Sequence, residues 1–222
     1  MMGSVASALA EAWESGQPVA PLTPDLALAC LEAAEQVAGD VLERLALPPC
    51  GIRVSETGLV GAMLPGRIVA TGQPLPLSVL PHGRAAPALL VVLAEAITPD
   101  GTGLPALERL HPALDLSASR WRDGPANLFE AAADLAGLGQ VVIGKGKRSG
   151  FPSSCALAPQ RAGRVDVAAL FETAVSVARE AGGLPLGAVL VLLFDRSGEA
   201  LAAPGPVTAR WTGLGTATAE LR

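Results

Sequence analysis

The sequence has no tyrosine, few other aromatic residues and few charges. Of its 222 residues, 3% are aromatic and 17% are charged, and the formal net charge is −5 at pH 7. Nucleic-acid-binding proteins usually carry clustered Lys and Arg residues interleaved with aromatic ones, which this chain lacks. The only basic run, residues 145–148, fits a solvated loop, with an anion site as the alternative. We therefore expect no nucleic-acid partner.

Cysteine is also scarce. Cys30, Cys50 and Cys155 are unevenly spaced, no two have the spacing of metal ligands, and an odd number argues against a disulfide framework. This usage is typical of a reducing compartment, so we expect a cytoplasmic protein. The first residues include Glu11 and Glu14 and no basic stretch, unlike a signal peptide.

Long hydrophobic runs are missing as well. The longest, residues 85–94 and 184–194, fall short of the ~20 residues that a membrane helix needs, so we expect no membrane partner. Half of the residues are nevertheless apolar, which allows a sizeable core. Both runs are rich in Val and Leu and are typical of buried strands.

The remaining pattern predicts helices at both ends of a region rich in strands. We expect a helix over residues 5–13 and a longer one over 23–47, where Thr23 can cap and Pro24 suits the first turn. Two later helices are expected over 125–138 and 166–180. Runs bounded by Gly and Pro predict strands over residues 52–54, 59–70, 86–96, 113–121, 140–144, 187–194, 207–211 and 216–221.

Some apparent site patterns are weak. Residues 139–145 have most of the spacing of a phosphate-binding loop, but their interior is typical of a strand and no helix follows. Cys155 lies outside any nucleophile motif and is interpreted as a buried or loop thiol. His82 and His111 are too far apart to form a ligand pattern, and each fits a turn or the start of a strand.

Several segments, in order along nearly the whole chain, resemble one known group of enzymes. They include His111 to Arg120 (HPALDLSASR), residues 131–144, residues 184–191 and the end around Gly213 and Gly215. Together they are similar to the 2-keto-4-pentenoate hydratase branch of the fumarylacetoacetate hydrolase superfamily. The resemblance implies an α+β fold, with a helical N-terminal segment (1–50) preceding a mixed, mostly β roll or barrel (51–222).

The same resemblance implies an altered site. Enzymes of that family hold a divalent cation with a Glu-x-Glu pair on one strand and a third acid on the next, because alternate residues of a strand share a face. The matching positions here are Ala86, Ala88 and Asp115, and the Lys of an early strand is Arg53. We therefore expect no metal and no other cofactor. We also expect Ala86 and Ala88 to lie beside Asp115, and Asp115 to share a face with Ser117 and Ser119.

Three functions remain open, and with them whether the chain is an enzyme. The first is a degenerate homologue, either silent or recruited to bind a small organic acid or a paralogous subunit. The second is an active lyase or hydrolase (a hydro-lyase, a decarboxylase or a C–C hydrolase) acting on a 2-oxo acid at an altered or metal-free site. There Arg53 would pair with a substrate carboxylate, Asp115 would act as acid and base, and His82 would shuttle a proton. The third is an unrelated soluble domain. Apolar strands and low charge predict a homodimer or a larger homo-oligomer.

Overall fold

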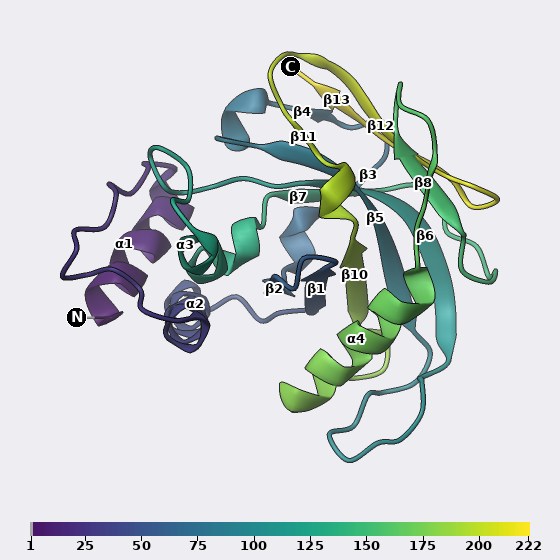
Figure 1. Ribbon diagram of the computed structural model, residues 1–222, viewed down its shortest axis with the longest axis horizontal. Coiled ribbons are helices and arrows are strands. Elements are labelled where there is room, and N and C mark those ends of the chain that lie inside the picture. The colour runs from purple at the N-terminus through teal and green to yellow at the C-terminus, as the bar shows by residue number, and fades with distance from the viewer. Residues whose placement is uncertain (1) are drawn as a thin grey trace.

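The computed structural model describes residues 2–222, apart from the side chains of Met2 and Ser197. Three helices, α1 (Met2–Ser15), α2 (Leu31–Leu45) and α3 (Leu128–Ala133), pack against one another at one side of two β-sheets (Figure 1). A fourth, α4 (Val167–Glu180), packs on strands of the larger sheet. No helix within the described residues is long and apolar enough to cross a membrane.

The larger sheet is mixed. Its strand order is β2-β1-β10-β5-β6-β7-β3, and β11 pairs with the start of β5. The β1–β10 and β3–β7 pairs are parallel, whereas the other pairs are antiparallel. The strands are β1 (Gly51–Ser55), β2 (Val60–Met63), β3 (Ile68–Ala70), β5 (Arg84–Leu93), β6 (Leu107–Leu116), β7 (Gln140–Ile143), β10 (Val189–Leu193) and β11 (Glu199–Ala200).

A smaller sheet packs against the larger one through β5, β6 and β7. Its order is β4-β13-β12-β8-β9, and β12 and β13 form an antiparallel hairpin. Its strands are β4 (Pro74–Leu75), β8 (Ser154–Leu157), β9 (Gly163–Arg164), β12 (Gly205–Trp211) and β13 (Gly215–Leu221). Alternate residues of facing strands, such as Leu114, Leu116 and Ala217, are buried between the sheets. The expected α+β class, helices on a mixed and mostly β half-barrel, is confirmed.

The helix α4 follows its sequence pattern closely. The Asp166 side chain accepts a hydrogen bond from the Ala169 N–H at 3.0 Å and caps the first turn. Leu170, Ala174 and Ala178 repeat every four residues and are buried in the core between α4 and the sheet. The helix predicted over 166–180 is confirmed.

The helix predicted from Thr23 is wrong at its start, because α2 begins at Leu31. The Leu26 N–H donates to the Thr23 carbonyl at 2.9 Å and forms only a turn, and Cys30 is extended. Leu28 is buried in the core shared with α1. Tertiary burial thus overrides the local capping signal. The helices α1 and α2 do precede β1. The division of the chain into two parts at residue 50 stays a prediction.

The helix predicted over 125–138 is also shorter than expected, and the turn that replaces its last residues borders the site described below. It begins only at Leu128, after Asn127, whose side chain accepts from the Glu130 N–H at 2.9 Å. After α3, Leu135 and Ala136 adopt left-handed backbone angles, with φ of 50° and 56°.

Two strand predictions were wrong in their bounds. The expected strand over 59–70 is interrupted by a 3-10 turn at Pro65–Arg67. The expected strand over 113–121 lies instead at Leu107–Leu116.

Candidate functional site

One cavity of about 380 Å³ brings together the residues that the sequence singled out. Arg53 on β1, Asp115 on β6 and His82 before β5 all line it, and so does Ala86 on β5. In the ladder between β5 and β6, Ala86 lies directly opposite Asp115. The expected adjacency is therefore confirmed for Ala86, whereas Ala88 lies opposite Ala113. Asp115, Ser117 and Ser119 all line the cavity, but Ala118 lines it too and β6 ends at Leu116, so the shared face stays a prediction.

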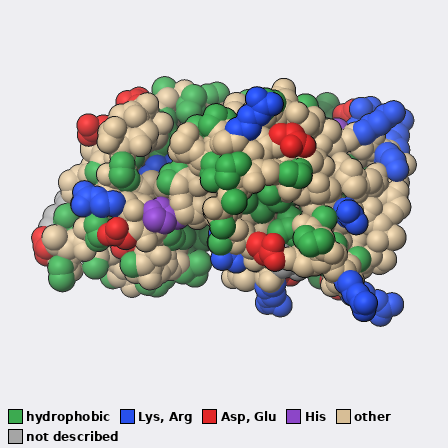
Figure 2. Space-filling model, turned by 90° about the horizontal axis from the view of Figure 1, so that it is seen from above, with side chains coloured by type: hydrophobic (Ala, Val, Ile, Leu, Met, Phe, Trp, Pro, Cys, Tyr) green, Lys and Arg blue, Asp and Glu red, His purple; other side chains and the backbone are tan. Residues whose placement is uncertain are grey.

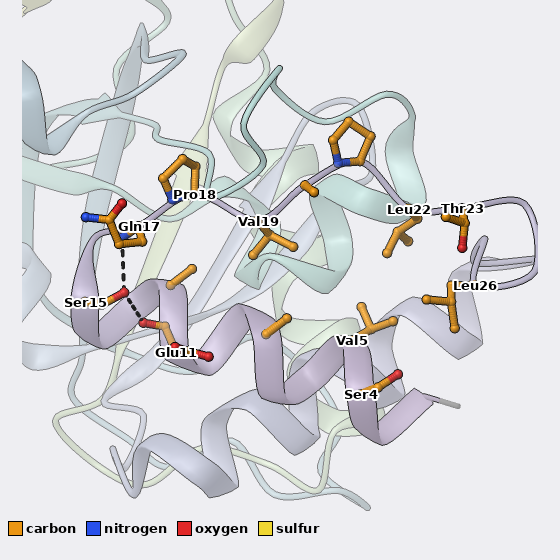
Figure 3. A pocket seen from close by; sticks show the side chains of 14 residues that line it. Ser4, Val5, Glu11, Ser15, Gln17, Pro18, Val19, Leu22, Thr23 and Leu26 are labelled. Atoms are coloured by element: carbon orange, nitrogen blue, oxygen red, sulfur yellow. Dashed lines mark hydrogen bonds between the residues drawn. The ribbon is translucent and has the colours of Figure 1, made fainter.

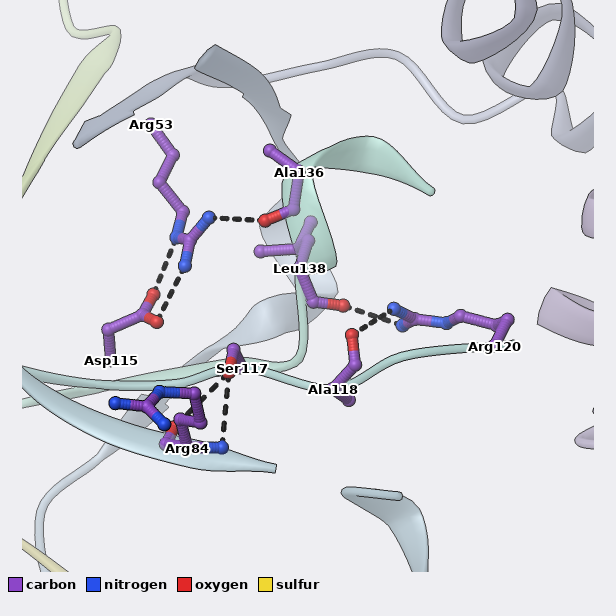
Figure 4. Close-up of polar contacts among 8 residues, drawn as sticks. All are labelled: Arg53, Arg84, Asp115, Ser117, Ala118, Arg120, Ala136 and Leu138. Atoms are coloured by element: carbon purple, nitrogen blue, oxygen red, sulfur yellow. Dashed lines mark hydrogen bonds and ion pairs between the residues drawn. The ribbon is translucent and has the colours of Figure 1, made fainter. Parts of the chain in front are cut away.

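Arg53 and Asp115 form a buried, bidentate ion pair (Figure 4). The guanidinium donates from Nε to Oδ1 at 2.6 Å and from Nη2 to Oδ2 at 2.7 Å, and both residues are 2% exposed. Its Nη1 donates to the Ala136 carbonyl at 2.7 Å. Three of the five guanidinium N–H groups are thus used, and both Asp115 oxygens are occupied.

The positions beside this pair offer no metal ligand. Ala86 and Ala88 are buried, and their methyl groups cannot coordinate a cation. Within residues 2–222, no group of three or more His, Cys, Asp and Glu side chains could hold a metal ion. The carboxylate opposite Ala86, that of Asp115, is already paired with a guanidinium and is poorly placed to bind a cation such as Mg²⁺.

A second buried pair, Arg120 and Asp134, is looser. The backbone N–H of Arg120 donates to Asp134 Oδ2 at 2.7 Å, but Nη1 lies 3.5 Å from Oδ1. The guanidinium also donates to the carbonyls of Ala118 and Leu138 (Figure 4). Burial raises the pKa of Asp134 to about 6, although Arg120 opposes the shift. Burial also lowers the pKa of Arg120 to about 10.

An aromatic contact connects this second pair to α1. The Arg120 guanidinium carbon lies 3.5 Å from the centre of the Trp13 ring, and that of Arg67 lies 4.6 Å from it. Such contacts are attractive because the face of the ring is negative. Asp134 itself lines the cavity, so α1 reaches the site through Trp13 and Arg120.

The turn after α3 is bound from three directions. Ala136 accepts from Arg53, Gly137 accepts from the Ala118 N–H at 3.0 Å, and Leu138 accepts from Arg120. Gly61 lies against this turn: a Cβ there would come within 2.7 Å of the Ala136 Cβ. The close approach therefore requires glycine at position 61.

The mouth of the cavity carries the remaining polar groups. His82 has a left-handed φ of 51°, and its Nε2 lies 2.8 Å from the Arg122 carbonyl oxygen. Arg84 is exposed, and its Nη2 donates to the Gly198 carbonyl at 2.9 Å. Neither Arg84 nor Arg196, which also lines the cavity, forms an ion pair within the described residues.

Sequence reasoning missed four of these residues: Trp13, Arg84, Arg120 as an ion-pair partner, and Asp134. Asp134 had a usable signal, because it is an isolated acid in the otherwise apolar segment 131–138. Arg84 lies two residues before Ala86 and hence on the same face of its strand. Trp13 had no such signal, because its contact depends on how α1 docks.

The weaker candidates lie elsewhere. Cys155 is buried, and burial raises the pKa of its thiol to about 12, which leaves it protonated and unreactive. The Nδ1 of His111 lies 2.9 Å from the Gly144 carbonyl oxygen. Residues 140–143 are strand β7, as the argument against a phosphate loop expected.

Another cavity, of about 450 Å³, lies between α1 and the segment that follows it (Figure 3). Val5 on the helix and Pro18, Val19 and Leu22 on the segment line it. None of the predicted site residues takes part. We interpret it as a groove left where an extended segment crosses a helix.

Known structures define the class of this fold. The 4-oxalocrotonate decarboxylase from Pseudomonas putida G7, complexed with magnesium and adipate, has a TM-score of 0.80 and 16% identity, covering 100% of this chain and 97% of that one. Fumarylpyruvate hydrolase from Pseudomonas aeruginosa, in complex with Mn²⁺ and pyruvate, has a TM-score of 0.57 and 15% identity, covering 77% and 88%. A 2-hydroxyhepta-2,4-diene-1,7-dioate isomerase from Mycobacterium marinum has a TM-score of 0.56 and 16% identity, covering 80% and 79%.

The chain therefore has the fold of the fumarylacetoacetate hydrolase superfamily, which includes decarboxylases, isomerases and hydrolases. The resemblance inferred from the sequence is confirmed at this level. No family model and no curated protein sequence matches the chain. At 11–17% identity, the similarity to these and other solved structures establishes the fold alone.

Proposed function

We propose that this protein is a metal-independent relative of these enzymes that binds a small organic acid in the cavity beside Arg53 and Asp115. The observation that carries the proposal is the bidentate pair opposite Ala86. A divalent cation needs several oxygen ligands, whereas this cavity has a guanidinium on its central carboxylate. Arg84 and Arg196, which line the cavity and form no ion pair within the described residues, would supply positive charge in place of a metal.

The structural neighbours support an acid as the ligand. Two of them were solved with adipate and with pyruvate, each together with a divalent cation. In this chain an acid would meet fixed arginine charges instead of a cation. The three predicted roles, with Arg53 binding a carboxylate, Asp115 acting as acid and base and His82 moving a proton, remain predictions.

Calorimetric titration with pyruvate and adipate tests the proposal. We expect the same affinity in excess EDTA and in excess Mg²⁺. The substitution Ala131→Leu, which fills the cavity from α3, should weaken binding, whereas Ala168→Leu on the exposed face of α4 should not. Binding that requires Mg²⁺, or no binding of either acid, would contradict the proposal.

A second candidate is an active lyase or hydrolase acting on a 2-oxo acid without a metal. The observation that favours it is Asp134, which lines the cavity with a pKa of about 6 and can exchange a proton near neutral pH. Asp115 is less suited to this task, because Arg53 occupies both of its oxygens. Turnover of a 2-oxo acid that resists chelator and is lost in Asp134→Asn would favour this candidate.

Self-association and a paralogous partner also remain proposals. Figure 2 shows one face on which charged side chains stand singly or in small groups among hydrophobic and uncharged ones. Several large apolar side chains are exposed, but they lie on different elements: Leu31, Leu47, Val79, Leu104, Leu128 and Leu186. Light scattering that gives a mass well above 22.4 kDa would support a homo-oligomer, and the monomer mass would contradict it.

A further inference from the structure

We infer that the ligand of this cavity is a monocarboxylate with a short hydrocarbon body, whose carboxylate binds Arg84 at the mouth. The inference rests on the proposed function and adds to it the class of acid, its orientation and a specificity-determining residue. One face of β5 carries both charge and methyl groups. Arg84, Ala86 and Ala88 alternate along the strand and share that face. Arg84 is exposed and the two alanines are buried, so charge lies at the mouth and methyl groups lie deeper.

The charges around the cavity favour an anion at the mouth. The two deep carboxylates, Asp115 and Asp134, are each paired with an arginine. Of the other charged side chains that line the cavity, Arg84 and Arg196 make no ion pair within the described residues. Asp195 makes none either, and it accepts a hydrogen bond from the Thr57 hydroxyl. With Arg120 counted as the partner of Asp134, although it does not itself line the cavity, one positive charge is in excess.

Arg84 is held ready to bind. Its Nη2 donates to the Gly198 carbonyl, and its backbone N–H donates to Ser117 Oγ at 3.1 Å. These contacts fix the stem, while Nε and Nη1 make no hydrogen bond within the described structure. Because Nη2 carries a second N–H, it still forms a two-donor edge with either Nε or Nη1, and this edge matches the two oxygens of a carboxylate.

The deeper cavity suits a hydrocarbon rather than a second carboxylate. Leu59, Ala86, Ala131 and Leu193 contribute apolar wall. The deep guanidinium of Arg53 is already neutralised by Asp115. Asp134 would repel a second carboxylate whenever it is ionised, and burying an unpaired charge is costly.

Hexanoate and adipate make a matched pair of probes, because they have the same carbon chain and differ by one carboxylate. In calorimetric titrations with EDTA, we expect hexanoate to bind at least about tenfold more tightly than adipate, and hexanamide to bind weakly. Arg84→Met should weaken hexanoate binding about tenfold, and Arg84→Lys should restore part of it. Arg210→Met, at an exposed arginine of β12 outside this cavity, is the control and should bind as the unchanged protein does.

The outcomes separate this inference from the proposed function. Adipate binding more tightly than hexanoate, or Arg84→Met binding hexanoate unchanged, would overturn the inference and leave metal-independent acid binding intact. If no acid binds, or if binding requires Mg²⁺, the proposed function fails and the inference fails with it. Circular dichroism of each variant establishes that a loss of binding is not a loss of fold.

Discussion

Two buried Arg–Asp pairs lie beside the same cavity and differ in almost every respect except composition. Arg53 directs two donors at Asp115, at 2.6 and 2.7 Å. Arg120 instead divides its guanidinium between two carbonyls and the Trp13 ring, and its Nη1 remains 3.5 Å from Asp134. Asp134 is therefore only partly compensated, and burial raises its pKa to about 6. The two pairs have the same residue types, so their difference comes from geometry. Asp115 is held by two short hydrogen bonds, whereas Asp134 can take up a proton.

The largest effect should come from breaking the tight pair. Asp115→Ala leaves the Arg53 guanidinium buried without a counter-charge, which should lower the free energy of unfolding by about 3–5 kcal/mol. The double substitution Arg53→Met with Asp115→Leu replaces the pair by apolar groups and should recover most of that loss. Urea denaturation measures both. A loss below about 1 kcal/mol for Asp115→Ala would show that the pair is not held as described.

The loose pair should make the free energy of unfolding depend on pH. The pKa of Asp134 is raised from 3.8 to about 6 in the folded state, so between these values the folded state binds more protons than the unfolded one. Its contribution to stability is therefore greatest below pH about 4 and falls as pH rises to about 6, by roughly 3 kcal/mol at most.

The difference in unfolding free energy between the unchanged protein and Asp134→Asn, measured across this range, isolates the effect. Carbon-13 NMR of the Asp134 carboxyl gives the pKa directly. A difference that does not vary with pH would contradict the assignment.

The Trp13 contact should have a smaller effect. Trp13→Leu removes the ring from Arg120 and Arg67 and should lower the free energy of unfolding by about 1–2 kcal/mol. It should also change the pKa of Asp134, because water admitted to the loose pair would lower this pKa, whereas loss of the Trp13 side-chain contact would raise it. Trp13→Phe keeps a ring and should change both quantities less. An Asp134 pKa that is the same in all three proteins would contradict an influence of α1 on the site.

The smallest expected effect is that of a divalent cation. Because no described cluster of acids could hold one, about 5 mM Mg²⁺ or Mn²⁺ should shift the unfolding temperature by less than about 1 °C. A site with micromolar affinity would raise it by several degrees at that concentration. Thermal unfolding with the metal and with EDTA makes the comparison. A clear rise would contradict the metal-free interpretation of the tight pair.

Local pattern predicted the parts of the fold whose causes are local. Asp166 before an apolar repeat predicted α4, and the strands predicted over 207–211 and 216–221 are those of the hairpin of β12 and β13. The resemblance placed Ala86 beside Asp115, because neighbouring strands carried the matching residues. The start of α2 was not predictable from local pattern. Thr23 resembles a helix cap, but Leu28 is buried against residues of α1 and the helix begins only at Leu31.

The pairing of the site was less accessible from sequence. Arg53 and Asp115 are 62 residues apart and lie on strands separated by β10 and β5, so their contact depends on the curvature of the sheet. The raised pKa of Asp134 depends on burial, which no local pattern reports. Its aromatic neighbour comes from the first helix of the chain, more than a hundred residues away.

The turn after α3 has a consequence for the timing of motions at the site. Three successive carbonyls, those of Ala136, Gly137 and Leu138, are bound by Arg53, the Ala118 N–H and Arg120. For the turn to open, three hydrogen bonds must break together: the one from Arg53, the one from Arg120 and the one from the Ala118 N–H. Its Gly137 and Leu138 amides, which donate within the turn, should therefore exchange hydrogen with solvent as slowly as core strands do. The floor of the cavity is thus a slow part of the molecule, in contrast to exposed side chains without such contacts, which change rotamer within nanoseconds.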